Sequence, residues 1–216
     1  MAKKKLNILI TAGGTREYID PVRYISNASS GRMGYAIARA AIKAGYAVTL
    51  ITAPTSLRPP KEAKIINVVT SDNMFKAVKA DFAKCDTLIM AAAVSDYKPT
   101  KASQTKLKKE QTVLSLKLKP TTDILKWAGR KKRKGQTVVG FALEDKNVLE
   151  NAEKKLKIKK LDMIVANTPA AIGADRSTLH IKTKTDNWAT YKNINKATSA
   201  KKLLVFVEGL AQAGML

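Results

Sequence analysis

An apolar strand, a glycine-containing loop and the start of a helix follow one another within the first 34 residues. Leu6–Ile10 supplies the strand, Gly13 and Gly14 follow it, and residues 29–34 (Ser-Ser-Gly-Arg-Met-Gly) open the helix. In such a unit the free backbone N–H groups and the helix dipole both favour an anion at the helix N-terminus. The order predicts a phosphate-binding β–loop–α unit, and it restricts the chain to an α/β fold.

The loop between the glycines and the helix is longer than nucleotide binding alone requires. It concentrates hydrogen-bond donors and acceptors in one place, as a reaction centre does. The polar residues concerned are Thr15, Arg16, Asp20, Arg23, Asn27, Ser29 and Ser30. We therefore expect chemistry as well as binding at this loop.

The rest of the chain alternates apolar runs with helical patterns. This rhythm predicts a Rossmann-like, mostly parallel sheet with helices on both faces, and the length of 216 residues suits a single domain spanning residues 1–216. Expected strands are Leu6–Thr11, Ala47–Thr52, Thr87–Ala92, Thr137–Phe141 and Asp162–Ala166, with a short additional one over Lys64–Val69. Expected helices are Met33–Ala44, Asp72–Lys84 (with Ser71 or Asp72 as its cap), Thr122–Lys131 and Lys146–Lys160.

Two regions interrupt this rhythm. Residues 98–113 are charged and poor in apolar side chains, which is typical of a mobile flap over a site, and an alternating strand is expected over Val113–Leu118. Ser177–Tyr191 has the pattern of a β-hairpin that turns near Thr185–Asn187. A final helix over Ser199–Gln212 closes the chain.

The charge balance is strongly positive, with 40 lysines and arginines against 17 acidic residues and a formal net charge of +23. Such a chain attracts nucleic acid, nucleoside triphosphates or phosphorylated metabolites. Only 6% of the residues are aromatic, which disfavours a nucleic-acid platform. Cys85 is the only cysteine and no apolar run reaches the length of a membrane span, so we expect a cytoplasmic protein with no membrane association.

Small residues followed by a carboxylate stand at the ends of two expected strands, in Met90–Tyr97 and Val139–Glu144. In a parallel sheet these carboxyl ends lie on the ligand-binding edge. Ala91–Ala93 would let a base or a phosphate approach the backbone, and Asp96 would bind a ribose, Mg²⁺ or a base amino group. The alternative is a tight strand–helix contact with Asp96 as a turn former, and the pattern alone leaves both open.

Lysines at two places suit a triphosphate. Lys106, Lys108 and Lys109 lie in the expected flap, where a mobile ammonium group can neutralise charge that develops on phosphorus. Lys155 and Lys159 are four residues apart in an expected helix, so both can face one anion. A row of solvated surface lysines has the same spacing.

Other chemistries are disfavoured. His180 is the only histidine and has no serine–carboxylate set around it, Cys85 is expected to be a core thiol, and zinc-type spacings are absent. Tyr97 and Lys101 match the Tyr-x-x-x-Lys dyad of short-chain dehydrogenases, but Pro99 argues against the helix that this dyad needs. Because the opening loop also lacks the dinucleotide glycine fingerprint, a nicotinamide-dependent Rossmann oxidoreductase remains a disfavoured alternative, as does a nucleic-acid-binding protein.

Several long motifs, in this order, resemble the phosphopantothenate–cysteine ligase family of coenzyme A biosynthesis. They are residues 10–17 (Ile-Thr-Ala-Gly-Gly-Thr-Arg-Glu), 20–34, 91–97, 106–109 (Lys-Leu-Lys-Lys), 139–144 and 162–167, so the resemblance covers essentially the whole chain. It implies that a nucleoside triphosphate activates the carboxylate of 4′-phosphopantothenate and releases pyrophosphate. The amine of L-cysteine then displaces the nucleotide from the acyl-nucleotidylate.

The same resemblance implies roles for individual residues. Asn27 and Lys106 match the family's catalytic positions, and Arg23, Asn27 and Ala93 match positions that bind phosphopantothenate. It implies no particular metal ligand. The nucleotide-binding positions that it implies are Met90, Ala91, Ala92, Asp96, Thr122, Asp123, Ile124, Leu125, Phe141, Lys155 and Lys159. The phosphate-binding β–loop–α unit adds Gly13, Gly14, Ser29 and Ser30 to the expected nucleotide site.

The resemblance also sets expectations for co-substrates and partners. CTP is the expected nucleotide, with ATP as the alternative, and Mg²⁺ is expected to bridge the triphosphate. The chain begins almost at the first strand, so we expect a stand-alone synthetase without the flavin-dependent decarboxylase domain and without flavin. A homodimer is expected, with the hairpin Ser177–Tyr191 as a candidate for the shared edge.

Overall fold

An eight-stranded sheet runs through the computed structural model, which describes residues 5–109 and 113–213. The strand order is β12-β11-β10-β9-β6-β1-β4-β5, and the six strands from β10 to β5 are parallel. The last two, β11 and β12, form an antiparallel hairpin at one edge. The expected Rossmann-like fold is confirmed. The strands are β1 (Asn7–Ala12), β4 (Ala47–Thr52), β5 (Lys64–Asn67), β6 (Thr87–Met90), β9 (Thr137–Leu143), β10 (Met163–Asn167), β11 (Arg176–Thr183) and β12 (Ala189–Asn195).

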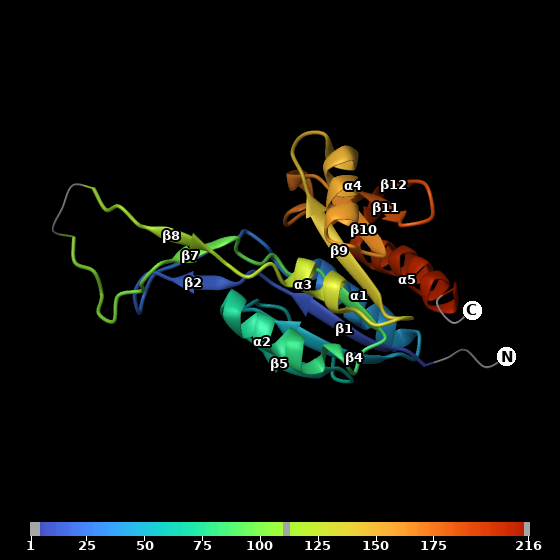
Figure 1. The fold of residues 1–216 in the computed structure, drawn as a ribbon, viewed down its shortest axis with the longest axis horizontal. Helices are drawn as coiled ribbons and strands as arrows, with labels where there is room; N and C mark the ends of the chain where they lie inside the picture. Colours follow the sequence, from blue (N-terminus) through green and yellow to red (C-terminus); the bar gives the residue numbers. More distant parts are fainter. Residues whose placement is uncertain (1–4, 110–112, 214–216) are drawn as a thin grey trace.

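Helices cover both faces of this sheet (Figure 1). On one face lie α1 (Arg32–Lys43) and α5 (Lys196–Ala213), and on the other lie α2 (Ser71–Phe82), α3 (Ile124–Lys131) and α4 (Val148–Ile158). Each face therefore has its own apolar core, and β1 serves both because successive side chains of a strand point to opposite faces.

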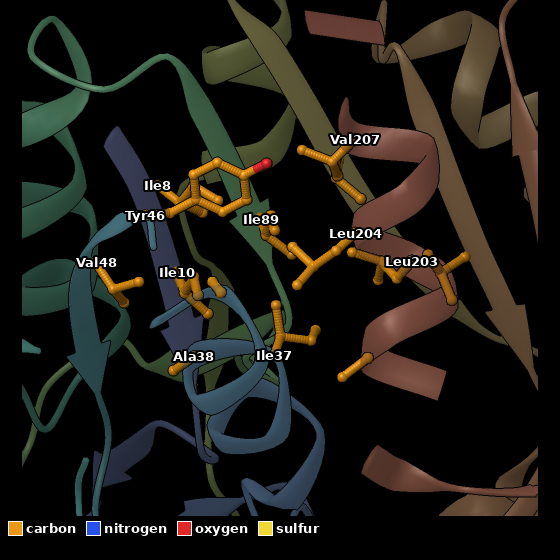
Figure 2. Packing of buried hydrophobic residues seen from close by; sticks show 14 of the residues in the cluster. Ile8, Ile10, Ile37, Ala38, Tyr46, Val48, Ile89, Leu203, Leu204 and Val207 are labelled. Carbon is orange, nitrogen blue, oxygen red and sulfur yellow. The ribbon is translucent and has the colours of Figure 1, made fainter. Parts of the chain in front are cut away.

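The core between β1, α1 and α5 illustrates this alternation. Figure 2 shows Ile8 beside Tyr46, and Ile10 in the same cluster as Ile37 of α1 and Leu204 of α5. Leu9, between them in sequence, packs in the opposite core with the residues of α2 and α3. Burying each such side chain contributes about 1.5–3 kcal/mol. These contacts hold the N-terminus of α1 close to the end of β1.

Gly34 permits an unusually close approach of α1 to β1. A Cβ atom at this position would lie 2.6 Å from Cβ of Ala12 and 3.0 Å from the carbonyl oxygen of Thr11. Gly13, just after β1, has φ +81°, and a Cβ there would meet the carbonyl oxygen of Ala53 at 2.7 Å. Gly13 and Gly34 are thus both required by the packing around the carboxyl end of β1.

A second structural unit, which we call the arm, projects from the sheet and helices (Figure 1). It pairs β2 (Arg16–Tyr18) with β3 (Tyr24–Ser26), and β7 (Tyr97–Pro99) with β8 (Leu118–Pro120). The sequence pattern does not indicate β2, β3 or β7. Their three-residue length gives no detectable periodicity, and they lie in segments rich in polar residues.

The strand expected over Val113–Leu118 is wrong. Of this range only Leu118 belongs to a strand, the start of β8, and Val113, Leu114 and Leu116 are exposed. Alternation specifies a strand only where one face is buried, and here neither face has a core to contact. The expected flap spans this segment, and its residues 110–112 lie outside the described part of the chain.

The helices begin within one to three residues of their expected starts, and for two of them a capping side chain explains the difference. The cap of α2 is Thr70, not Ser71 or Asp72, because Oγ1 of Thr70 accepts a hydrogen bond from the Asn73 amide at 3.1 Å and Oδ1 of Asn73 accepts one from the Thr70 amide at 3.3 Å. The final helix begins at Lys196, three residues before the expected Ser199. Asn195 precedes it and its side-chain oxygen accepts a hydrogen bond from the Thr198 amide at 2.8 Å.

Cys85 lies in the core beyond α2, as expected. Its thiol donates a hydrogen bond to the carbonyl oxygen of Phe82 at 3.3 Å. Burial raises the pKa of this thiol to about 11, so it stays protonated near neutral pH.

Candidate functional site

The carboxyl ends of β1 and β6 mark the point where the chain reverses its direction across the sheet. After β1 the chain continues to β4 and β5 on one side, and then crosses to β6 on the other side of β1. Backbone hydrogen bonds extend this pairing past the strands, from the Ala93 amide to the Gly13 carbonyl at 2.9 Å and from the Thr15 amide to the Ala93 carbonyl at 3.2 Å. Ligands of open α/β sheets bind at such a point.

Two adjoining pockets open here. The larger has a volume of about 490 Å³, and the smaller has a volume of about 350 Å³. Both are lined by Ala92, Val94, Asp96, Phe141 and Lys155, so the pockets meet at these residues. Ligands in the two pockets would therefore contact one another at Asp96, Phe141 and Lys155.

Most of the residues predicted to bind the nucleotide line the smaller pocket. The strand end after β6, the start of α3 and one side of α4 bring them together. They are Met90, Ala92, Asp96, Thr122, Asp123, Ile124, Leu125, Phe141, Lys155 and Lys159. The apolar part of this wall suits a base, and the two lysines suit phosphates.

The two lysines differ in their surroundings. Lys155 is half-buried, and burial, followed by the charge of Lys159, lowers the pKa of its ammonium group. Lys159 donates to Oδ1 of Asp123 at 3.0 Å. Burial alone would raise the pKa of Asp123, but hydrogen bonds from the Lys126 amide and from Lys159 hold it below its usual value. Lys155 is thus a half-buried cation with a lowered pKa, and it lies beside the ion pair that Lys159 forms with Asp123.

The larger pocket receives another group of predicted residues. Asn27, Ser29 and Ser30 reach it from the loop before α1, and Ala91 and Ala93 from the segment after β6. The Asn27 amide nitrogen donates to the Val94 carbonyl at 3.3 Å, which fixes the side chain across the two segments. Ser29, Ser30 and Ala91 were predicted to bind the nucleotide, whereas the structure places them in the larger pocket and not in the smaller one.

Gly13, Gly14, Arg23 and Lys106 line neither pocket. Gly13 and Gly14 follow β1 outside both pockets. A Cβ atom at Gly13 would meet the Ala53 carbonyl oxygen, and one at Gly14 would meet the Asn27 carbonyl oxygen. Arg23 and Lys106 belong to the arm, and the structure does not bring them to the residues with which the resemblance grouped them.

Asp20 connects the arm loop to the flap. Its carboxylate accepts hydrogen bonds from the Val22 and Arg23 amides at 2.9 and 2.8 Å and from the Leu107 amide at 3.1 Å. The guanidinium of Arg23 pairs with the same carboxylate and donates to the Leu107 carbonyl at 2.7 Å. The Arg23 guanidinium holds the pKa of Asp20 well below its usual range. Lys106 therefore directly precedes Leu107, whose backbone is hydrogen-bonded to Asp20 and Arg23.

Two basic residues of the larger pocket were not among the predicted site residues. Arg32 and Lys196 are the first residues of α1 and α5. Arg32 lies within the motif of residues 20–34, so the sequence could have indicated it as a site residue. Lys196 had none, because only the folded chain brings the start of α5 to the end of β10.

The structure bears on the alternative chemistries too. Tyr97 belongs to β7 and Lys101 follows it in a bend, so the dehydrogenase dyad has no helix to display it. His180 donates to or accepts from the Thr190 hydroxyl at 2.9 Å, within the edge hairpin. Within residues 5–109 and 113–213 there is no group of three or more His, Cys, Asp or Glu side chains that could hold a metal ion. No helix in these ranges is long and apolar enough to cross a membrane.

The fold and the pockets define a Rossmann-like α/β protein whose ligand site has two joined compartments at the carboxyl edge of the sheet. The model of one family matches residues 3–210, and the chain belongs to that family, the DNA/pantothenate metabolism flavoprotein C-terminal domain.

Individual relatives and a solved structure match most of the chain. The chain is 43% identical over 195 residues to a cysteine/cysteine sulfinic acid decarboxylase of an unknown prokaryotic organism, covering 87% of this chain and 54% of the relative. It is 39% identical over 203 residues to the coenzyme A biosynthesis bifunctional protein CoaBC of Borreliella burgdorferi, covering 93% and 52%. The chain thus spans about half the length of these curated relatives. A crystal structure of the C-terminal domain of CoaBC is 36% identical, with 96% of each chain covered and a TM-score of 0.84.

Proposed function

We propose that the chain is a phosphopantothenate–cysteine ligase, which forms an amide between 4′-phosphopantothenate and L-cysteine and cleaves a nucleoside triphosphate. The main support is the meeting of the two pockets at Asp96, Phe141 and Lys155, because a carboxylate in one pocket then lies beside the α-phosphate of a nucleotide in the other. The family and the CoaBC relatives, named for coenzyme A biosynthesis, support the same substrate class.

The proposed reaction has two steps at this junction. A carboxylate oxygen attacks the α-phosphorus, the bond from that phosphorus to the bridging oxygen breaks, and pyrophosphate leaves with the bonding electrons. The amine of cysteine then attacks the acyl carbon, the nucleoside monophosphate leaves, and the amine proton passes to solvent. Mixed anhydride formation turns a poor acylating agent into one with a stabilised leaving group.

Cations and dipoles of the site are suited to the first step. Lys155 and Lys159 hold the triphosphate, with Lys159 exchanging its contact to Asp123 for a phosphate oxygen. Lys106 reaches the triphosphate when the flap leaves its hydrogen bonds to Asp20 and Arg23. Asn27 and Ala93, in the larger pocket, position the acyl group.

The remaining parts of the proposal concern co-substrates and assembly. CTP is the proposed nucleotide and ATP the alternative. Asp96 lines both pockets and would hold a Mg²⁺ ion, which would neutralise phosphate charge. The proposed reaction oxidises and reduces no group, and so it needs no flavin. We propose a cytoplasmic homodimer, for which the free edge of β12 is a candidate surface, and sedimentation velocity tests it.

Pyrophosphate release tests the function. Purified protein is incubated with Mg²⁺ and 4′-phosphopantothenate, with CTP or ATP in separate reactions, and with or without cysteine. Release that requires phosphopantothenate, with amide product only after cysteine is added, is the expected result. No release with either nucleotide, from protein shown to be folded by circular dichroism, would sink the proposal.

Matched lysine variants sharpen this test. Lys155→Gln is expected to raise the KM for the nucleotide by about 10- to 100-fold, because it removes a charged contact to phosphate. Lys154→Gln, the neighbouring lysine on the exposed side of α4, is the control and should leave the KM unchanged. Equal effects of the two variants would point to the general charge of the protein rather than to the site.

A further inference from the structure

Arg32 and Lys196 form a pair of cations in the larger pocket to which the proposed reaction has given no role. Both line the larger pocket and neither lines the smaller one. They begin two helices that pack against each other, α1 and α5, at the same face of the sheet. The pair therefore lies in the part of the larger pocket that is not shared with the nucleotide.

Their contacts in the described structure leave room for an anion. Arg32 donates to Oδ1 of Asp175 at 2.6 Å and to the Gly173 carbonyl at 3.2 Å. Lys196 donates to two uncharged acceptors, the Ala171 carbonyl and the Ser177 hydroxyl, each at 3.2 Å. Asp175 is thus the carboxylate that balances the pair, and its side chain is 89% exposed.

The electrostatics of Lys196 point in the same direction. Burial, followed by the charge of Arg32, lowers the pKa of its ammonium group. Two cations close enough to influence each other in a half-buried pocket are destabilising unless an anion lies between or beside them. The backbone N–H groups at the start of α1, where Gly31 provides no side-chain cap, add positive potential to the same end of the pocket.

The chemistry of the proposed substrate decides which anion this is. 4′-Phosphopantothenate carries a carboxylate at one end and a phosphate ester at the other. If the carboxylate lies at the junction beside Asp96, Phe141 and Lys155, the phosphate must lie in the unshared part of the larger pocket. We propose that Arg32 and Lys196 bind the 4′-phosphate, that the phosphate displaces Asp175 from Arg32, and that the pair selects phosphorylated over unphosphorylated substrate. This inference rests on the proposed ligase function.

Steady-state kinetics with two substrates test the pair. Arg32→Gln and Lys196→Met are compared with the wild type on 4′-phosphopantothenate and on pantothenate, which lacks the phosphate. Each variant should raise the KM for phosphopantothenate by about 10- to 100-fold, with kcat/KM for pantothenate unchanged. Arg39→Gln on α1 and Lys201→Met on α5 remove equal charge from exposed positions outside the pockets, and both should behave as the wild type.

Asp175→Asn gives a prediction of opposite sign. It frees Arg32 from its carboxylate partner without altering either cation, so the KM for phosphopantothenate should fall. This variant tests the inference even where Arg32→Gln or Lys196→Met fails to fold. An unchanged or higher KM in Asp175→Asn, or equal losses on both substrates in the cation variants, would overturn the inference.

Calorimetry separates this inference from the proposed reaction. Wild type and Arg32→Gln are titrated with 4′-phosphopantothenate and with pantothenate in the absence of nucleotide. Arg32-dependent preference for the phosphorylated compound supports the phosphate site even if the wild type makes no amide product. Turnover by the wild type with no such preference supports the ligase and overturns the phosphate site.

Discussion

At the scale of single residues, environment separates side chains that the sequence presents as equivalent. Lys155 and Lys159 have the spacing of a solvated row, yet both line the smaller pocket. Among the residues that the structure describes, only Lys159 has a carboxylate partner in hydrogen-bond contact. The spacing correctly predicted that they share a face. It did not predict that burial would lower the pKa of Lys155, because this depends on how α4 packs on the sheet.

This difference predicts the pH dependence of nucleotide binding. In the proposed function a triphosphate is held by the protonated form of Lys155. Burial, followed by the charge of Lys159, lowers the pKa of this lysine, and the carboxylates of Glu144, Asp96 and Asp123 offset part of that lowering. As pH rises through that pKa the cation is lost, so wild-type affinity should weaken at a lower pH than the one at which an ordinary lysine loses its charge. Lys155→Arg keeps its charge there and should give a flatter profile of Kd against pH. Parallel profiles of the two proteins would contradict the prediction.

At the scale of elements, the opening β–loop–α unit was predictable because its signals are local. An apolar run, two glycines and a helix start mark β1 and α1 in the sequence itself. The arm was not predictable, since β2, β3, β7 and β8 have three residues each and pair with one another through contacts that no local pattern reports. Most of the lining of the smaller pocket was inferred by resemblance, while the start of α5 at Lys196 was not.

The close contact of α1 with β1 predicts the effect of a methyl group. Gly34→Ala would place its Cβ 2.6 Å from Cβ of Ala12, so the helix must shift, and the free energy of unfolding should fall by about 1–3 kcal/mol in urea denaturation. Gly209→Ala in α5 is the control, because its Cβ would meet no atom within 4 Å. That variant should be neutral or more stable by about 0.4–1 kcal/mol. Equal destabilisation of both would show that helix glycines, not the β1 contact, decide the result.

The contacts of Asp20 predict the behaviour of the flap. Asp20→Asn weakens the pairing with Arg23 and the acceptor for the Leu107 amide, so that amide should exchange with deuterium faster, on the order of tenfold. Asp81→Asn, which breaks a lysine pair elsewhere on the surface, should leave Leu107 unchanged. Unchanged exchange in Asp20→Asn would mean that other contacts hold the flap.

At the scale of the whole molecule, the net charge of +23 acts on every anion that approaches. Both 4′-phosphopantothenate and the nucleotide are polyanions, whereas cysteine is a zwitterion near neutral pH. Raising the salt concentration shortens the range of the attraction, so the KM values of the two polyanions should rise several-fold between about 0.05 and 0.5 M KCl while that of cysteine changes little. A similar rise for all three substrates would show that salt affects the fold or the chemistry rather than capture. Random DNA that inhibits at low salt only would be a further effect of the same field.

The solitary, buried Cys85 gives the protein a practical property. Its protonated thiol, shielded in the core beyond α2, should be inert to maleimide in the native state. A fluorophore or spin label attached to a cysteine introduced at an exposed flap position, such as Lys108, would then report from one known site without removing any native thiol. The distance between such a label and a spectroscopic nucleotide would follow flap closure directly during turnover.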